Sequence, residues 1–359
     1  MGDTTRKADV SILECTLRDG SYVINFQFTA RDTEVIASAL DEAGFDLIEV
    51  GHGIGLGASE KGMGVAAETD VGYMAAAARA VKRGRWGMFC IPGVATLGQL
   101  EQAIDHGMGF VRIGTEVADV ADSQPFIAEA KKVGLFVCAN FMKSYATPAD
   151  AFAERVLESE QYGADCVYIV DSAGGMFPDD IRRYVDAVRR RSDIKLGFHG
   201  HNNLGLGIAN ALAAAECGIA IVDASLQGFG RSAGNAATEQ LICALARRGI
   251  DLGLDPIRVM DIGEHYIAPL ITARGINSID VVSGLAQFHS SYMGLIREFA
   301  GKYGVDPRHL IIAVCHRDKV SAPRAMVEEE ARKLADLGCL VDGVTTRFQL
   351  NRYFGSEQK

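Results

Sequence analysis

Two histidines separated by one residue, His199 and His201, have the spacing of a metal site. Residues i and i+2 of an extended strand point to the same side, so both imidazoles can reach one ion. Such a pair also fits two buried, hydrogen-bonded histidines, but Asp19 follows another apolar run and adds a carboxylate. Two imidazoles and one carboxylate leave coordination positions open for a bidentate substrate. We therefore predict that Asp19, His199 and His201 bind one divalent metal ion.

The residues around this set suit carbonyl chemistry. Arg18 precedes Asp19 and offers a planar cation that can stabilise an enolate or oxyanion beside the metal. A salt bridge to Glu49 is the plainer interpretation of Arg18, and both roles are compatible if Glu49 holds the guanidinium in place. Ser172 can donate a hydrogen bond to a substrate carboxylate, or it can cap a helix.

Eight short apolar runs must position these residues. Each run is followed by a segment with helical apolar spacing, which is typical of βα units and a parallel sheet. Glycines at 44, 107, 163 and 218 stand where a helix should end before a strand. No GxGxxG motif follows the first run, which disfavours a doubly wound dinucleotide fold. The runs are 11–16, 46–50, 86–91, 110–114, 135–141, 166–171, 195–199 and 221–226.

Eight such units predict an α/β fold, a closed TIM (β/α)8 barrel over residues 1–250. Catalytic groups of this fold lie at the carboxyl ends of the strands, where the predicted site residues stand. After Leu245 the spacing is helical without further clear strands, so we expect a helical C-terminal domain over 251–359. The stretch 320–338 is amphipathic and suits either a partner interface, a homodimer contact or packing on the barrel.

Composition excludes several classes of protein. The 359 residues include 36 Lys and Arg against 46 Asp and Glu, a formal charge of −10, which disfavours nucleic acid and anionic lipid partners. We find neither the roughly 20 uninterrupted apolar residues of a membrane span nor a secretory leader, so we expect a cytoplasmic location. Eight cysteines without a CxxC pair indicate reduced, mostly buried thiols.

Several motifs resemble one enzyme family. They are TLRDG at 16–20, EVGHGIGLG at 49–57, DSAGG at 171–175, HGHNNLGLGIAN at 199–210 and AGNA at 233–236. Together they resemble the metal-dependent pyruvate aldolases of the 4-hydroxy-2-oxovalerate aldolase type. These belong to the DRE-TIM metallolyase superfamily, whose other branches include HMG-CoA lyase and isopropylmalate synthase. The resemblance covers nearly the whole chain, because the helical tail is similar to the C-terminal domain of that family.

The resemblance implies an activity and a set of roles. It implies a carbon–carbon lyase, a class II aldolase that cleaves or forms a 4-hydroxy-2-oxo acid to or from pyruvate and an aldehyde. Asp19, His199 and His201 would bind Mn²⁺, with Mg²⁺ or Co²⁺ as alternatives, and Asn235 would be a further ligand or a neighbour of the ligands, as would Glu49. Arg18 would polarise the pyruvate carbonyl, and Ser172 would hold its carboxylate.

The sequence departs from the family at the catalytic base. In the aldolases a histidine stands two residues after the glycine of TLRDG, whereas this chain has Tyr22. In the tail, where the family has a tyrosine before a Ser-Ser pair, this chain has His289. We therefore predict that Tyr22 and His289 are exchanged and face each other across the mouth, with proton transfer at His289 or at water near it. The alternative is that Tyr22 only packs and His289 is a surface residue.

Three further residues are candidate substrate contacts. Lys143 ends the fifth run and Arg231 lies in a glycine-rich loop after the eighth, where the family has mostly neutral residues. Two cations at one mouth predict an aldehyde that carries a carboxylate or phosphate, unless they only balance an acidic surface. His52 is a candidate because it follows the second run.

Three other functions remain open at this stage. The sister branches suggest a Claisen-type acyl-CoA lyase or synthase, Lys143 could instead form a Schiff base, and the exchanged base could mark a non-catalytic metal-binding barrel. The resemblance also implies that the tail docks an aldehyde dehydrogenase. We expect a homo-oligomer, most simply a dimer.

Overall fold

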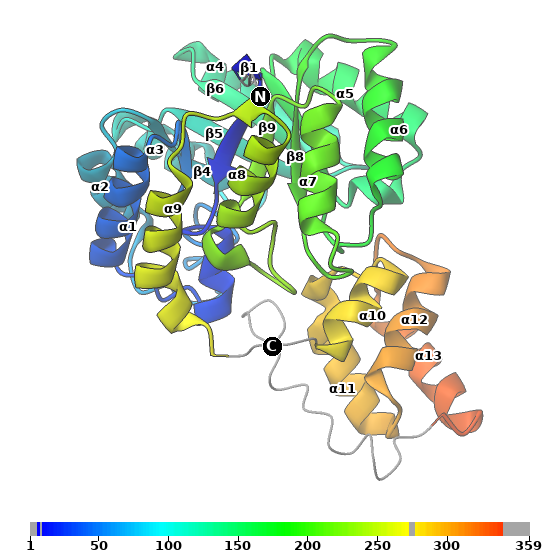
Figure 1. Cartoon of the computed structure of the whole chain (residues 1–359). Coiled ribbons are helices and arrows are strands. Elements are labelled where there is room, and N and C mark those ends of the chain that lie inside the picture. Colours follow the sequence, from blue (N-terminus) through cyan, green and yellow to red (C-terminus); the bar gives the residue numbers. More distant parts are fainter. Residues whose placement is uncertain (1–5, 8, 273–276, 340–359) are drawn as a thin grey trace.

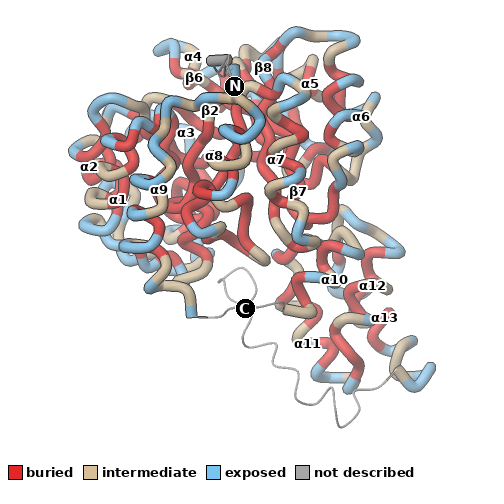
Figure 2. The backbone as a smooth tube through the Cα atoms, in the orientation of Figure 1, coloured by how far each residue is buried: buried red, intermediate tan, exposed pale blue. Residues whose placement is uncertain are grey.

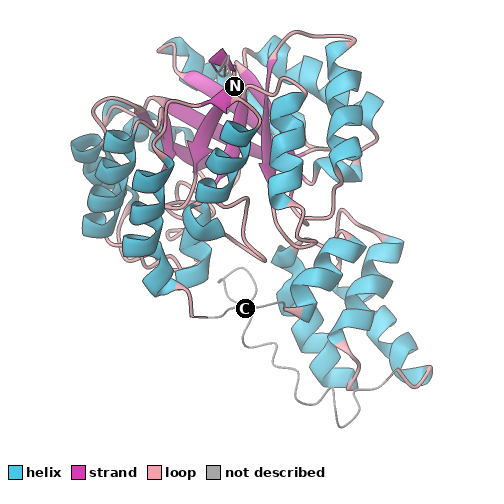
Figure 3. Ribbon diagram, viewed as in Figure 1, coloured by secondary structure: helices cyan, strands magenta, loops and turns pink. Residues whose placement is uncertain are grey.

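The computed structural model describes residues 6–7, 9–272 and 277–339 of the chain. Eight parallel strands close into a barrel in the order β2-β3-β4-β5-β6-β7-β8-β9 (Figure 3). Each of the eight predicted runs forms one of these strands, so the predicted barrel is confirmed. The strands are β2 (Ser11–Glu14), β3 (Leu47–Glu49), β4 (Arg85–Cys90), β5 (Phe110–Glu116), β6 (Phe136–Met142), β7 (Cys166–Asp171), β8 (Lys195–Gly200) and β9 (Ile221–Ala224).

Helices cover the outside of the barrel (Figure 1). The four glycines predicted to end helices all have positive φ, at 102°, 87°, 104° and 80° for Gly44, Gly107, Gly163 and Gly218. These values suit glycine because it has no Cβ to clash. The helices around the barrel are α1 (Ala30–Ala43), α2 (Asp70–Ala80), α3 (Leu97–Asp105), α4 (Gln124–Lys132), α5 (Ala149–Tyr162), α6 (Pro178–Arg189), α7 (Gly207–Glu216), α8 (Thr238–Arg247) and α9 (Pro256–Ile262).

Two strands end two residues earlier than the sequence predicts. The first and eighth runs were expected to extend to residues 16 and 226, but β2 ends at Glu14 and β9 at Ala224. The carboxylate of Glu14 accepts hydrogen bonds from the backbone N–H groups of Thr16 (3.0 Å) and Leu226 (2.9 Å). These bonds replace sheet hydrogen bonds, so the segments after β2 and β9 turn out of the sheet. This turn brings the TLRDG segment over the barrel mouth, where a short 3-10 helix, Asp19–Ile24, follows.

Helices α10 (Ser278–Ala286), α11 (Met293–Tyr303), α12 (Pro307–Arg317) and α13 (Arg324–Asp336) form a second unit beside one end of the barrel (Figure 1). They share a hydrophobic cluster of their own, and buried positions run through both units (Figure 2). Val327 and Ala331 place one face of the amphipathic 320–338 stretch in that cluster. Helical packing within the tail therefore accounts for this face.

The hydrophobic cluster of the barrel extends further along the sequence than residue 250. Val259, Ile262 and Ile267 belong to the barrel cluster, and the second cluster begins at Ile279. A two-residue strand, β10 (Ile250–Asp251), was also not expected; it pairs with β1 (Arg6–Lys7). By its packing, α9 therefore belongs with the barrel. Whether the two domains divide at residues 250 and 251 stays a prediction.

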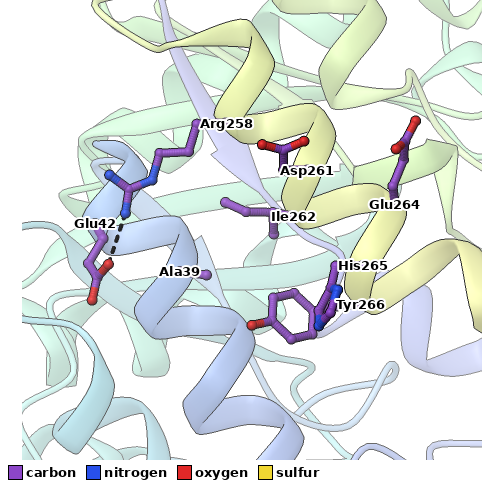
Figure 4. A pocket seen from close by; sticks show the side chains of 8 residues that line it. All are labelled: Ala39, Glu42, Arg258, Asp261, Ile262, Glu264, His265 and Tyr266. Carbon is purple, nitrogen blue, oxygen red and sulfur yellow. Dashed lines mark hydrogen bonds and ion pairs between the residues drawn. The ribbon is translucent and has the colours of Figure 1, made fainter.

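A hollow on the barrel surface lies between α1 and α9 (Figure 4). In it Arg258 is paired with Glu42, with 2.8 Å between their charged atoms. Asp261 and Glu264 add further charge, but neither belongs to the metal-binding groups found among the described residues. The cavity that contains the predicted ligand residues lies elsewhere, at the carboxyl ends of the strands.

The state of the cysteines and the lengths of the helices can be compared with the expectations from composition. All eight cysteines are free, and five of them are buried. In the described part of the chain, no helix has the length and apolar character needed to cross a bilayer.

Candidate metal centre and active site

A cavity of about 270 Å³ opens at the carboxyl ends of the barrel strands. Most of its wall comes from the barrel, and His289 and Ser291 of the helical unit complete it. The predicted site residues among those that line it are Arg18, Asp19, Tyr22, Ser172, His199, His201, Arg231 and His289. The structure therefore brings eight of the twelve predicted site residues together at one cavity.

Asp19, His199 and His201 form the predicted ligand set. Their ligand atoms all lie within 4.8 Å of one another, and all three residues are buried. His199 Nδ1 lies 2.8 Å from Asp223 Oδ2, and His201 Nδ1 lies 3.1 Å from the carbonyl oxygen of Asp171. Both rings therefore keep Nε2 for another partner, as is usual for metal-binding histidines.

The Nε2 atom of His201 argues against the alternative that the two histidines are only buried and hydrogen-bonded. Among the residues that the structure describes, none is a hydrogen-bond partner of the buried His201 Nε2, which lies 3.7 Å from Asp19 Oδ2. Burying a polar atom unpaired costs free energy, so such atoms are rare unless a ligand occupies the place. Two imidazole nitrogens and a carboxylate are a donor set for a divalent ion. These residues therefore fit the metal that the sequence predicts.

The charge of Asp19 is secured by its neighbours. Burial alone would raise the pKa of Asp19, but Arg18 and, more weakly, the two histidines and Arg231 lower it well below its usual range. Arg18 Nη1 donates to Asp19 Oδ1 over 2.7 Å. The carboxylate is thus ionised throughout the physiological pH range, as a metal ligand must be.

Arg18 makes the salt bridge to Glu49 and still faces the cavity. Its Nε donates to Glu49 Oε2 over 2.7 Å, and its guanidinium lies 5.0 Å from the ring centroid of Phe89. Glu49 is itself fully buried and does not line the cavity. The salt bridge to Glu49 is therefore present and leaves Arg18 on the cavity wall, while its role beside a metal stays a prediction.

Asn235 lies beside the ligand set. Its Nδ2 donates to Asp19 Oδ2 over 2.8 Å, and its buried Oδ1 has no hydrogen-bond partner within the described part of the chain. That free carbonyl oxygen keeps a role as an additional ligand open, in line with the sequence expectation.

A second group of metal-ligand residues, Cys15, His199 and Asp223, shares one histidine with the first. Burial raises the pKa of the Cys15 thiol well above its usual range, and the thiol donates to the carbonyl oxygen of Ala224. A protonated thiol is a poor metal ligand. Within this group Asp223 bonds His199 Nδ1, whereas the Cys15 thiol bonds the backbone of Ala224.

Tyr22 and His289, the proposed exchanged pair, line the same cavity from the two units. Tyr22 packs edge-on to Phe26, and Gly53 makes room for it, since a Cβ there would lie 2.8 Å from the Tyr22 ring. His289 Nδ1 lies 2.7 Å from Ser291 Oγ. Burial, with smaller effects from the cations Arg231 and Lys143, lowers the pKa of His289 well below its usual range. A neutral imidazole therefore faces the cavity at neutral pH.

Ser172 and Arg231 meet at the cavity wall. Arg231 Nη2 donates to the carbonyl oxygen of Ser172 over 3.2 Å, and its Nη1 pairs with Ser290 Oγ from the helical unit. Ser172 Oγ accepts from the backbone N–H of Lys143 over 3.0 Å. The Ser172 hydroxyl proton is not used in that bond and can serve a substrate oxygen.

Two predicted substrate contacts are not among the residues that line the cavity. Lys143 Nζ lies 3.1 Å from Glu116 Oε1 and turns towards the helical unit. His52 is stacked on Phe26 at 3.8 Å between centroids, accepts from the N–H of Ile54 at Nδ1 and lies 3.2 Å from the carbonyl oxygen of Gly64 at Nε2. The sequence could not separate strand-end residues that face the cavity from those that hold the loops around it.

The family model described as HMGL-like matches residues 9–265, which contain the barrel and its ligand set. The chain belongs to the HMGL-like family. Relatives share more than the barrel: a 4-hydroxy-2-oxovalerate aldolase of Thermomicrobium roseum is 40% identical over 86% of this chain and 87% of that protein. A second, from Rhodococcus jostii, is 41% identical over 91% of this chain and 95% of its own length.

Solved structures agree with the fold of this HMGL-like chain. The carboxyl transferase domain of Rhizobium etli pyruvate carboxylase, with pyruvate and biocytin, has a TM-score of 0.75 at 16% identity, covering 94% of this chain and 62% of that one. The N-terminal domain of a putative aldolase from Bacteroides vulgatus has a TM-score of 0.65 at 24% identity over 78% of this chain and 94% of that one. The aldolase resemblance and the assignment as a carbon–carbon lyase are thus confirmed, and the acyl-CoA alternative is not favoured.

Sequence analysis missed one charged network of this HMGL-like barrel. Arg112, in the middle of β5, is fully buried and bonds Glu49 Oε1 at 2.8 Å and also Asp223 Oδ2. Glu49 holds Arg18, and Asp223 holds His199, so Arg112 joins the supports of the cation and of a metal ligand. An arginine inside an otherwise apolar strand was the signal that could have found it.

Proposed function

We propose that this protein is a metal-dependent aldolase that cleaves or forms a 4-hydroxy-2-oxo acid, with pyruvate and an aldehyde as the other side of the reaction. The observation that carries the proposal is the buried, unpartnered His201 Nε2 beside Asp19, with the Arg18 guanidinium bonded to the same carboxylate. The relatives named 4-hydroxy-2-oxovalerate aldolase support it.

Asp19, His199 and His201 would hold the divalent ion, with Mn²⁺ as the proposed metal and Mg²⁺ or Co²⁺ as alternatives. Imidazole and carboxylate ligands suit all three ions, so the choice among them rests on the resemblance. When bound, such an ion supplies Lewis-acid polarisation of the substrate's 2-oxo group.

Arg18 contributes fixed positive charge where the enolate of pyruvate develops. Its guanidinium is held by Glu49 and Asp19, so it needs no reorganisation during the reaction. Ser172 is the proposed partner of the oxo acid carboxylate, which is supported by its hydroxyl proton, since the bond from the Lys143 N–H does not use that proton.

His289 is the proposed proton acceptor for the 4-hydroxyl group. Nδ1 accepts from the backbone N–H of Ser291 over 3.3 Å, so a basic Nε2 requires the other tautomer, in which Nδ1 carries the proton and donates to Ser291 Oγ. As His289 takes the hydroxyl proton, the bond between C3 and C4 breaks, its electron pair forms the enolate, and the aldehyde leaves. The same proton can return to the enolate carbon to give pyruvate. Tyr22 is the proposed hydrogen-bond donor from the opposite wall.

The charge of the aldehyde is a separate part of the proposal. The sequence predicted an anionic aldehyde from two cations, but Lys143 is not among the lining residues. Arg231 remains as the candidate contact for an anion. The apolar residues Ile54, Ile91 and Val94, which also line the cavity, suit a neutral chain instead.

The remaining expectations concern assembly and location. A homodimer, a dehydrogenase partner bound through the helical unit and a cytoplasmic location stay proposals that rest on the resemblance and the composition. Nothing in the described fold favours a non-catalytic barrel, because the ligand set and Arg18 both face the same cavity.

The proposal is tested by incubating Mn²⁺-loaded protein with pyruvate in heavy water and then adding neutral and anionic aldehydes. We expect deuterium in the methyl group of pyruvate, condensation with at least one aldehyde, and loss of both on adding EDTA. Activity that survives EDTA, or trapping of protein by borohydride and pyruvate, would show an imine mechanism at a lysine. Metal binding without exchange would support the non-catalytic alternative.

A further inference from the structure

Lys143 stands at the junction of the barrel and the helical unit. It follows β6, and only 2% of its side chain is exposed. Its ammonium donates to Tyr292 Oη over 3.0 Å and to the carbonyl oxygen of Val320 over 2.8 Å, and it pairs with Glu116 Oε1 at 3.1 Å. An ammonium has three N–H bonds, so these three oxygens use all of its donors.

The three partners come from different parts of the chain. Glu116 ends β5 and lines the cavity, Tyr292 belongs to the helical unit just after His289, and Val320 lies between α12 and α13. Tyr292 Oη also donates to the carbonyl oxygen of Val320 over 2.8 Å. The ammonium therefore joins two segments of the helical unit to one wall of the barrel.

The backbone of Lys143 is fixed independently of its ammonium. The residue has φ 57° and ψ 41°, a left-handed conformation that non-glycine residues seldom adopt. Its N–H donates to Ser172 Oγ on the cavity wall. The starting position and direction of the Lys143 side chain are thus fixed, which limits the positions that Tyr292 and Val320 can take.

The buried charge of Lys143 favours one position of the helical unit on the barrel. If the helical unit shifted, the ammonium would lose two oxygens while remaining in a site with little water, which is costly. Other contacts join the units as well: Asn203 Nδ2 donates to the carbonyl oxygen of Asp280 over 3.0 Å, and the Arg231 guanidinium bonds Ser290 Oγ. Lys143 differs from these contacts because its one ammonium bonds two separate segments of the helical unit, at Tyr292 and at Val320.

We propose that Lys143 is a positioning residue that seats the segment from His289 to Tyr292 over the barrel mouth. The inference rests on the proposed aldolase function for its kinetic consequence, but the seating itself can be measured without catalysis. It replaces the roles in aldehyde binding and imine formation that the sequence suggested for this lysine. It also explains why the lysine occupies a strained backbone position beside the site.

The test compares Lys143→Met with Lys131→Met, a matched control whose ammonium pairs with Asp165 at 2.8 Å on the barrel surface. We expect hydrogen exchange of the backbone to rise by about tenfold or more in residues 288–293 and 318–322 of Lys143→Met only, since local opening controls exchange. Displacing His289 should lower kcat by about 10- to 100-fold. Mn²⁺ affinity and the KM for the oxo acid should stay close to wild type, because their ligands lie in the barrel.

Unchanged exchange together with unchanged kcat in Lys143→Met would overturn the proposal, and so would a parallel loss of Mn²⁺ affinity, which would mean general damage to the barrel. If Lys143→Met does not fold by circular dichroism, Tyr292→Phe is the second variant. It removes one oxygen partner and keeps the ring, so a smaller change in the same direction is expected and no change counts against the seat. If the wild-type protein lacks aldolase activity, the exchange measurement still decides the seating.

Discussion

His199 Nδ1 and Asp223 Oδ2 lie 2.8 Å apart inside the barrel, and this contact decides which nitrogen of His199 faces the cavity. Asp223 in turn bonds Arg112, which bonds Glu49, which holds Arg18. The orientation of a metal ligand and that of the proposed electrostatic catalyst are therefore linked through one buried network.

The first prediction follows from that contact. Asp223→Ala removes the partner that orients His199, so Mn²⁺ affinity should fall by about 10- to 100-fold, as is usual for partners of metal ligands. Isothermal titration calorimetry measures it. The control is Asp165→Ala, which removes a partly exposed carboxylate between α5 and β7, away from the cavity. Equal affinities in the two variants would mean that His199 is not held in place by Asp223, or is not a ligand.

Arg18 is expected to matter for the reaction more than for the metal. In Arg18→Met the charge opposite the developing enolate is lost, and kcat should fall by about 100- to 1000-fold, the range for a preorganised donor to an oxyanion. Glu49 keeps Arg112 as a partner, so the fold should survive. Arg85→Met, at a surface pair with Asp46, is the control. Deuterium exchange into pyruvate at the wild-type rate would contradict the role.

The pH profile should identify the proton acceptor. The pKa of His289 is lowered, so the neutral base persists below the ordinary histidine value, and the acid limb of kcat/KM should lie below about pH 6.5. His289→Ala should lower kcat and remove that limb when metal is saturating at every pH. A limb that is identical in the variant would assign it to another group, with Tyr22→Phe as the next test.

The same shift affects stability. The unfolded chain binds the His289 proton near pH 6.5 and the folded chain only at lower pH, so folding loses stability as the pH falls below about 6.5. His289→Ala should lose less stability between pH 7 and pH 5.5 than the wild type, as measured by urea unfolding. Parallel curves for both proteins would contradict the lowered pKa.

The separate core of the helical unit gives a further prediction. Leu310 is fully buried there, so Leu310→Ala should cost about 2–5 kcal/mol of stability. Leu285 is 67% exposed, and Leu285→Ala should change stability by no more than about 0.5 kcal/mol. Differential scanning calorimetry of both variants is the measurement. If the boundary lies near Ile279, an early transition in Leu310→Ala should leave the barrel transition in place.

The sequence by itself determined the barrel and the ligand set. Alternation along a strand and the carboxyl-end rule for parallel barrels are local or general, so Asp19, His199 and His201 could be placed together from their positions alone. The glycines that end helices were readable for the same reason, because a positive φ is a property of one residue.

Only the tertiary structure decided how side chains at the rim are used. Lys143 and Arg231 look alike in the sequence, yet Arg231 lines the cavity and Lys143 binds the helical unit. Arg112 was hidden because its partners, Glu49 and Asp223, lie on other strands far away in the chain. A side chain's direction and its charge partners depend on the packing of distant segments, and no spacing rule within one segment contains that information.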